Sequence, residues 1–236
     1  MATYVIGDIH NARKQLEELL QRISPARQDR LYLLGDLFDR GGDDPDPAGV
    51  YFKILETGMY TNVTWIRGNH DQLLADYIVR YYRTPERKRK HLEPYRYNSF
   101  DLLRERLVEV DMLHLAEQIK ALPLQAEITV GSGKYLLAHA MTFAPYGGKQ
   151  EAGAYLEGLE EMKDYWQHGV EGYLSLVGHH DPTLPYMDQN GGYLDGGVTS
   201  VWKNKAGNLY LMDCGCGLPH GRLACMCLES GERFYA

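Results

Sequence analysis

Three stretches of sequence decide the fold: residues 3–10 read TYVIGDIH, residues 30–41 read RLYLLGDLFDRG, and residues 62–71 read NVTWIRGNHD. Each stretch begins as a short apolar run with strand composition and then reaches a glycine followed by Asp or Asn. Segments with helical composition lie between them, at residues 11–23, where Asn11 is placed to cap the start, and at residues 48–58. Strands that alternate with helices predict an α/β fold with a largely parallel sheet.

Polar and charged side chains gather directly after these predicted strands. Because the carboxyl ends of parallel strands meet at one edge of a sheet, where open α/β proteins bind ligands, we expect these side chains to lie together. A hairpin predicted over residues 125–140 and a strand predicted over residues 173–177 each bring a further histidine. One such residue has an ordinary structural explanation, but five strand ends in order along one chain indicate a site. The candidates are Asp8, His10, Asp36, Asp39, Arg40, Arg67, Asn69, His70, His139 and His179.

The motifs Gly-Asp-x-His, Gly-Asp-x-x-Asp-Arg-Gly and Gly-Asn-His-Asp, followed by two separate histidine motifs, resemble those of the calcineurin-like metallophosphoesterases. More closely, they resemble the phosphoprotein phosphatases, especially the small bacterial and phage members. The resemblance extends from residue 5 to about residue 228 and leaves residues 72–122 without a motif. It implies the calcineurin-like fold, a central β-sandwich flanked by helices on both faces. We expect a single domain over residues 1–236, with the helical segment 72–122 as a cap or insertion within it.

The resemblance also implies two divalent metal ions. By this similarity, Asp8 and His10 bind the first ion, Asp36 bridges both, and the second ion is held by Asn69, His139 and His179. Carboxylates and imidazoles suit manganese, iron and zinc, and manganese is the first choice. Two such ions about 3.5–4 Å apart clamp an in-line phosphoryl displacement, with a metal-bridging hydroxide as the nucleophile.

Four further residues take roles from the same resemblance. His70 matches the general acid that protonates the leaving oxygen, and Asp39 matches the partner that orients its imidazole. Arg40 and Arg67 match the phosphate clamps, since a planar guanidinium suits the geometry of the anion.

Two functions share this framework. The favoured prediction is a metal-dependent phosphomonoesterase acting on serine/threonine phosphoproteins; the alternative is a symmetrical dinucleoside polyphosphate hydrolase or another phosphodiesterase. Asp39 decides which function is favoured, because the corresponding motif of the symmetrical hydrolases resembles Gly-Asp-x-x-Ala-Arg-Gly, with alanine at the position of Asp39. A carboxylate there supports His70 as an acid, which a poor alkoxide leaving group requires. A catalytically dead binding module is disfavoured, because every matched ligand position is intact.

Charge and composition argue against other classes of protein, such as nucleic-acid-binding and membrane proteins. The 236 residues are 44% hydrophobic and 24% charged, and the net charge of −7 argues against a general nucleic-acid binder. No apolar run approaches the roughly 18 residues of a membrane span, and the N-terminus reads as a strand, so a cytoplasmic location is expected. The expected partners are a phosphorylated protein or a small phosphoester, with neither a membrane nor nucleic acid.

Residues 80–96 form a basic segment with seven Lys or Arg and two Glu. A phosphate-facing patch, helped by Tyr81, Tyr82, Tyr95 and Tyr97, is one interpretation. A solvated helix and loop is the favoured one, because charge runs usually face water.

The remaining expectations concern local structure. A helix is predicted over residues 151–166, with turns at 190–192 and 205–208. The cysteines at 214, 216, 225 and 227 are interpreted as buried free thiols rather than a zinc site. His180 is expected to be exposed, and structural or solvated positions are expected for His91, His114, His168 and His220.

Overall fold

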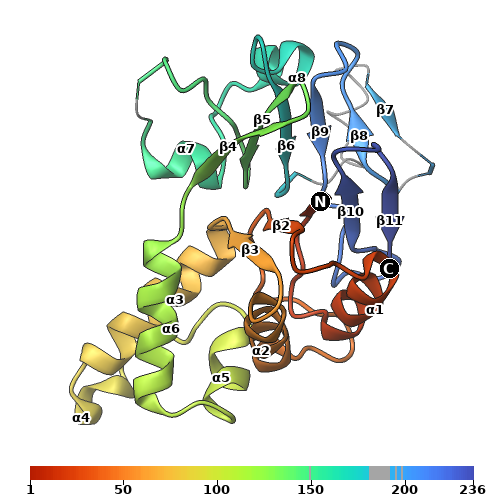
Figure 1. Cartoon of the computed structure of the whole chain (residues 1–236). Coiled ribbons are helices and arrows are strands. Elements are labelled where there is room, and N and C mark those ends of the chain that lie inside the picture. Colours follow the sequence, from red (N-terminus) through yellow and green to blue (C-terminus); the bar gives the residue numbers. More distant parts are fainter. Residues whose placement is uncertain (149, 181–191, 195, 198) are drawn as a thin grey trace.

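The computed structural model describes residues 1–148, 150–180, 192–194, 196–197 and 199–236 (Figure 1). One sheet has the strand order β11-β10-β1-β2-β3. Its parallel centre is formed by β1 (Thr3–Ile6), β2 (Arg30–Leu33) and β3 (Asn62–Trp65), and β10 (Ala224–Cys227) and β11 (Arg233–Tyr235) are added antiparallel. The first three strands therefore end at one edge, as the sequence predicts.

The second sheet has the order β4-β5-β6-β9-β8-β7. The predicted hairpin is present as β4 (Gln125–Val130) and β5 (Gly133–Ala138), which pair antiparallel. Strand β6 (Leu174–Val177) lies parallel between β5 and β9 (Leu209–Leu211). The short strands β8 (Trp202–Lys203) and β7 (Tyr193–Leu194) complete the sheet.

Alternating side chains of the strands build two separate cores. In β1, Val5 lies in a cluster with Leu137 and Leu176 of the second sheet, whereas its neighbour Ile6 lies in a cluster with Leu16 of the first helix. Successive residues of a strand point to opposite faces, so one strand serves both layers. The first cluster forms the interior of a β-sandwich.

Helices cover both outer faces of this sandwich. The first sheet packs against α1 (Arg13–Ile23), α2 (Pro47–Gly58), α3 (Asn69–Arg83), α5 (Ser99–Arg104) and α6 (Glu109–Ala121). The short helix α4 (Glu86–Arg89) forms the tip of the projecting α3–α6 region (Figure 1). On the second sheet, α8 (Lys163–His168) contributes Tyr165 and Trp166 to a third apolar cluster, and α7 (Ala152–Leu156) precedes it. The predicted sandwich between helices is confirmed.

Two local predictions are wrong. Asn11 does not cap the first helix, which begins at Arg13 after Ala12; its side-chain amide instead donates to Ser99 Oγ at 3.0 Å. The segment 151–166 is two short helices rather than one, because Gly158 between them has φ +85°, outside the helical range. The turn at 205–208 forms, whereas most of the turn expected at 190–192 lies outside the described residues.

The prediction for the cysteines agrees with the structure in burial: all four are buried. Cys216 and Cys225 belong to the core under the first sheet, and Cys214 belongs to the core between the sheets. Within the described ranges, no helix combines the length and the apolar character needed to cross a membrane.

Candidate active site

The candidate ligands follow the carboxyl ends of five parallel strands. Asp8 and His10 come after β1, Asp36 after β2 and Asn69 after β3. From the second sheet, the histidines at 139 and 179 come after β5 and β6. The residues after these strands lie close together, as expected, but they come from the edges of two sheets rather than from one edge of a single sheet.

Glycines allow this close approach. A Cβ on Gly178 would lie 2.0 Å from Asp8 Oδ1, and a Cβ on Gly68 would lie 2.2 Å from Asp36 Oδ1. Atoms of any larger residue would overlap the carboxylates, so glycine is required at both positions. The glycines of the motifs therefore act by leaving space for the acidic side chains.

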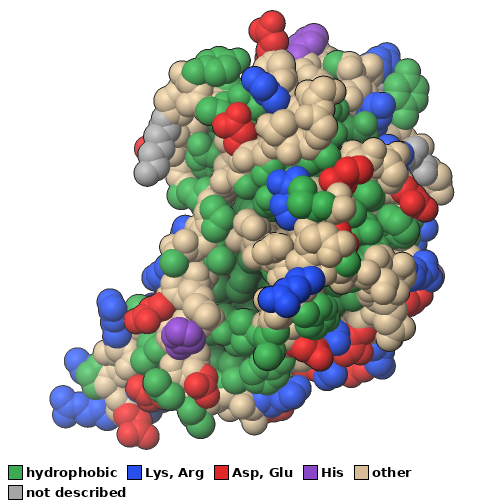
Figure 2. Space-filling view, viewed as in Figure 1, with side chains coloured by type: hydrophobic (Ala, Val, Ile, Leu, Met, Phe, Trp, Pro, Cys, Tyr) green, Lys and Arg blue, Asp and Glu red, His purple; other side chains and the backbone are tan. Residues whose placement is uncertain are grey.

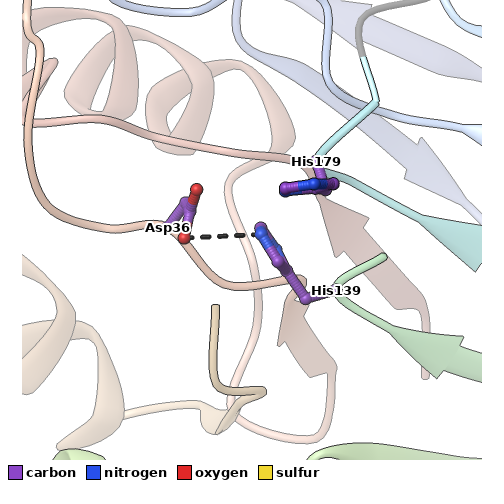
Figure 3. Close-up of side chains that lie close together, drawn as sticks. All are labelled: Asp36, His139 and His179. Atoms are coloured by element: carbon purple, nitrogen blue, oxygen red, sulfur yellow. Dashed lines mark ion pairs between the residues drawn. The ribbon is translucent and has the colours of Figure 1, made fainter. Parts of the chain in front are cut away.

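Asp36 lies at the centre of the site. Its Oδ1 is 3.4 Å from His139 Nε2 (Figure 3). Its Oδ2 is 3.7 Å from His10 Nε2. Two groups of ligand atoms, each within 4.8 Å, share this carboxylate: one adds Asp8 and His10, the other adds His139 and His179. Two three-residue groups that share one carboxylate form the donor arrangement expected for a pair of neighbouring metal ions.

Backbone carbonyls orient two of the imidazoles. His10 Nδ1 lies 3.0 Å from the carbonyl oxygen of Phe38, and His139 Nδ1 lies 2.8 Å from that of Leu34. A ring that donates its Nδ1 proton to a carbonyl presents the lone pair of Nε2 as a metal ligand. The orientation of both rings therefore fits metal binding.

The amide of Asn69 completes the second group. Its Oδ1 lies 2.9 Å from His139 Nε2 and 3.2 Å from His179 Nδ1. In each contact a ring N–H can donate to the amide oxygen, and a metal ion would take the place of that proton. The nitrogen and oxygen donors present suit divalent manganese, iron or zinc.

Electrostatics in the buried site also favour added positive charge. Burial raises the pKa of Asp8 well above its usual value, and the nearby Asp213 raises it further. Burial lowers the pKa of His10 to about 4, so this imidazole carries no compensating charge at neutral pH. Burial opposes ionisation of Asp36, but His139 lowers the pKa of that carboxyl. Divalent ions would supply the positive charge that buried carboxylates require.

A second cluster of side chains lies beside these ligands. His70 Nδ1 is 2.8 Å from Asp39 Oδ2, and both side chains are buried. The hydroxyl of Tyr95 donates to the same carboxylate oxygen at 2.7 Å, and the amide N–H of Ser99 lies 3.3 Å from the other oxygen. The ring of His70 stands perpendicular to that of His10, with 5.2 Å between centroids. His70 therefore lies next to the ligand groups in a fixed orientation.

The sequence of residues 1–215 matches the family model of the calcineurin-like phosphoesterases. The chain belongs to this family. The resemblance seen in the motifs is thereby confirmed for the family and the fold, and the family is one of phosphoesterases.

Individual relatives of this phosphoesterase carry more specific names. It is 33% identical over 188 residues to a symmetrical bis(5'-nucleosyl)-tetraphosphatase of Acidovorax sp. (strain JS42), covering 78% of this chain and 58% of the relative. The same name applies to a Buchnera aphidicola protein that is 29% identical over 178 residues, covering 75% of this chain and 56% of that protein. The chain thus spans less than two thirds of either relative.

A solved structure supports the fold. The protein serine/threonine phosphatase from Saccharomyces cerevisiae with similarity to human phosphatase PP5 aligns with a TM-score of 0.60 and 14% identity. The alignment covers 100% of this phosphoesterase and 79% of the yeast chain. At this identity the likeness concerns the fold alone.

The two arginines predicted to bind phosphate, Arg40 and Arg67, differ in their contacts. Arg40 Nη1 lies 3.0 Å from His10 Nε2, so its guanidinium reaches the ligand groups. Arg67 instead donates to Gln72 Oε1 at 2.8 Å and to the carbonyl oxygen of Leu122 at 2.9 Å. The structure therefore brings Arg40 to the ligands, and the role of Arg67 as a phosphate clamp stays a prediction.

The favoured interpretation of residues 80–96 as a solvated helix and loop is correct for only part of the segment. Basic side chains project into solvent at the tip around α4, and Arg87 and Lys88 are exposed (Figure 2). The end of the segment behaves differently, because Tyr95 reaches Asp39 and Tyr97 packs on His70 with ring centroids 4.4 Å apart. The aromatic residues among the basic ones were the available signal for this contact.

Sequence reasoning also gave no role to Asp71. This fully buried carboxylate accepts the backbone N–H groups of Asp36, Leu37 and Gly68 at 3.0, 3.0 and 2.9 Å, and the indole N–H of Trp65 at 3.1 Å. It thus ties the loop after β2 to the start of α3. The signal was an acidic residue in the first turn of a helix.

The other histidines follow the sequence prediction with one exception. His180 was expected to be exposed, but it is buried at 9% exposure between the rings of Trp166 and His179. Its position directly after a buried strand explains the error, because the chain continues inward there. The remaining four are exposed: His91, His114, His168 and His220.

Proposed function

We propose that this metallophosphoesterase hydrolyses a phosphoanhydride bond of dinucleoside polyphosphates. The observation that carries the proposal is the similarity, over 188 residues, to symmetrical bis(5'-nucleosyl)-tetraphosphatases. The order of the two sequence-based functions is thereby reversed, since these relatives support the alternative better than the serine/threonine phosphatase.

In this proposal, the chain's own side chains would provide two overlapping sets of metal ligands. Asp8 and His10 would hold one ion and share Asp36 with a second, which would also take Asn69, His139 and His179. When bound, divalent ions neutralise phosphoryl oxygens and lower the pKa of water. Manganese remains the first choice, with iron and zinc as alternatives.

Arg40 is placed to bind the phosphoryl group. Its guanidinium lies against the imidazole of His10, at the edge of the ligand groups. A planar fork of N–H donors matches two oxygens of a phosphate and strengthens as negative charge develops on them. Arg40 would therefore orient the phosphorus for attack in line with the leaving oxygen.

His70 would supply the proton for the leaving group. In the hydrolysis, a water that has released one proton to solvent forms a bond from its oxygen to phosphorus while the bond between phosphorus and the bridging oxygen breaks. The electron pair of that bond stays on the departing oxygen, which takes a proton from His70 Nε2. Asp39 accepts from Nδ1 of the same ring at 2.8 Å and so holds Nε2 toward the substrate.

Hydrolysis of serine or threonine phosphomonoesters is the second candidate. The contact between Asp39 and His70 favours it, because an alkoxide leaves poorly without a proton whereas a phosphate group leaves more easily. This candidate uses the same ligands and the same acid. It differs in the substrate that enters the site.

Initial rates on diadenosine tetraphosphate and on a phosphoserine peptide test the proposal. The metal-stripped protein would be assayed with and without added Mn²⁺, alongside His70→Asn and the control His114→Asn, which alters an exposed histidine. We expect Mn²⁺-dependent hydrolysis of the dinucleotide with the higher kcat/KM. We also expect a loss of rate in His70→Asn and an unchanged rate in the control.

Each other outcome has a defined meaning. Turnover of the peptide alone would replace the proposal with the second candidate. Turnover of the dinucleotide without any metal would contradict the assignment of the ligand groups. An unchanged rate in His70→Asn would remove this histidine as the acid.

A further inference from the structure

A pocket of about 310 Å³ is lined in part by Tyr95 and Tyr97, the residues that contact Asp39 and His70. One wall is α3, which contributes Leu73, Tyr77 and Arg80. The other wall is the segment that returns toward the active site, with Tyr95, Arg96 and Tyr97. Its volume falls at the lower end of the range of about 300–1,000 Å³ that is typical of small-molecule sites.

The pocket shares two side chains with the acid cluster. Tyr95 lines it and donates its hydroxyl to Asp39, and Tyr97 lines it and packs its ring against His70. His70 is the proposed donor of a proton to the leaving oxygen. Whatever is attached to that oxygen therefore enters the active site on the side where this pocket begins.

The walls of the pocket present flat aromatic and guanidinium faces. The rings of Tyr77 and Tyr95 lie 5.1 Å apart, the guanidinium of Arg80 lies 5.0 Å from the centre of the Tyr77 ring, and that of Arg96 lies 5.4 Å from the Tyr97 ring. Nucleobases stack on tyrosine rings and on guanidinium planes. These faces fit a planar heterocycle better than a flexible polyphosphate chain.

Acidic groups at the rim agree with a base rather than a phosphate. Asp76 and Glu93 line the pocket together with the two arginines. Carboxylates repel phosphate oxygens but accept hydrogen bonds from amino groups and ribose hydroxyls. The two arginines offset the two carboxylates, and Asp76 also pairs with Lys120 at 2.7 Å, so the pocket offers no excess positive charge to a phosphate chain and fits an uncharged nucleoside better.

We propose that this pocket binds the nucleoside on the leaving-group side of a dinucleoside polyphosphate. The inference rests on the proposed function and adds the position of one half of the substrate. It makes the α3 face and residues 93–97 determinants of specificity. A peptide chain in the same place is the competing occupant.

Two substrates with the same bond and different ends test the pocket. Diadenosine tetraphosphate carries nucleosides, and inorganic tetrapolyphosphate does not. Leu73→Trp would fill the pocket and Arg80→Ala would remove one of its faces, whereas Arg83→Ala removes an exposed arginine of the same helix outside the pocket. We expect KM for the dinucleotide to rise about tenfold in the two pocket variants, the scale of one lost stacking contact. KM for tetrapolyphosphate should change less than about twofold in these variants. In Arg83→Ala, KM for the dinucleotide and KM for tetrapolyphosphate should each change less than about twofold.

A binding measurement separates this inference from the proposed function. Adenosine would be titrated into the metal-free protein and followed by amide chemical shifts in NMR spectra. We expect shifts in α3 and in residues 93–97 of the wild type, and their loss in Leu73→Trp. Adenosine binding without hydrolysis of either polyphosphate would overturn the proposed function and support the pocket as a nucleoside site.

The opposite results overturn the inference. Hydrolysis of the dinucleotide with unchanged KM in both pocket variants, and no shifts with adenosine, would leave the proposed function standing and remove the pocket as its nucleoside site. A raised KM for the phosphoserine peptide in these variants, without adenosine shifts, would assign the pocket to a peptide instead.

Discussion

The carboxylate of Asp39 holds the imidazole of His70 through a contact of 2.8 Å between Oδ2 and Nδ1. Both side chains are buried; Asp39 lies in the loop after β2, and His70 lies in the first turn of α3, which follows β3. The contact fixes the ring, and in the proposed reaction Nε2 is the nitrogen that would face the substrate. This pair therefore links the fold to the proposed proton transfer.

Replacing Asp39→Asn should separate the two candidate functions. Loss of the carboxylate weakens the orientation of His70 and should lower kcat for a phosphoserine peptide about 100-fold, the scale of a lost general acid. A phosphate leaving group needs less protonation, so kcat for diadenosine tetraphosphate should fall less than about tenfold. Steady-state rates on both substrates provide the measurement, with Asp43→Asn, at an exposed position of the same loop, as the control. Equal losses on both substrates would contradict this argument.

Tyr95 should act through Asp39. Burial raises the pKa of the Tyr95 phenol and the charge of Asp39 raises it further, so the hydroxyl stays protonated and donates at 2.7 Å. Tyr95→Phe keeps the ring and removes this hydrogen bond, which should reduce kcat by roughly 3–10-fold and stability by about 1–2 kcal/mol. Rates and urea unfolding would measure the two effects.

The control for this variant is Tyr81→Phe, which removes a phenol from the same aromatic group but not from the acid pair. Its kcat should match that of the wild type. A purely structural role for Tyr95 would appear as a loss of stability with an unchanged pH profile and an unchanged kcat.

The positions of the candidate ligands could be predicted from sequence because each lies shortly after a recognisable strand. Asp8, Asp36 and Asn69 follow apolar runs within a few residues, and the rule for parallel sheets brings such strand ends together. Local sequence therefore contained both their identity and their approximate position. His10 and Asp36, for example, lie 3.7 Å apart because they follow the neighbouring parallel strands β1 and β2.

The aromatic side of the site could not be predicted in this way. Tyr95 and Tyr97 return to His70 after the chain has passed through α3 and α4, and this return depends on packing among distant helices. No periodic pattern in the sequence encodes such a contact. The basic residues around them favoured a solvated interpretation, which holds for Arg87 and fails for the two tyrosines.

The shared position of Asp36 predicts how metal binding responds to substitution. Asp36→Asn removes a carboxylate from both ligand groups, so the affinity for both ions should fall by well over the roughly 10–100-fold expected for a supporting contact. His179→Ala affects one group and should leave about one ion per chain instead of about two. Metal analysis after dialysis against Mn²⁺ would measure the stoichiometry, with the exposed Asp101→Asn as the control. Equal stoichiometry in the two ligand variants would argue against a shared carboxylate.

Asp71 should stabilise the fold rather than take part in the reaction. Its buried carboxylate accepts four N–H groups, including that of Asp36 at 3.0 Å and the indole of Trp65 at 3.1 Å. In Asp71→Asn an amide N–H₂ would face these donors, and at least one buried donor would lose its acceptor. Hydrogen bonds to charged groups contribute about 1.5–3 kcal/mol each, so we expect a loss of about 2–4 kcal/mol of unfolding free energy. For a chain of this size the melting temperature should fall by roughly 4–16 °C, measurable by thermal unfolding. The exposed Asp101→Asn should change it by less than about 2 °C, and a similar small change in Asp71→Asn would contradict the proposed anchoring of the loop after β2.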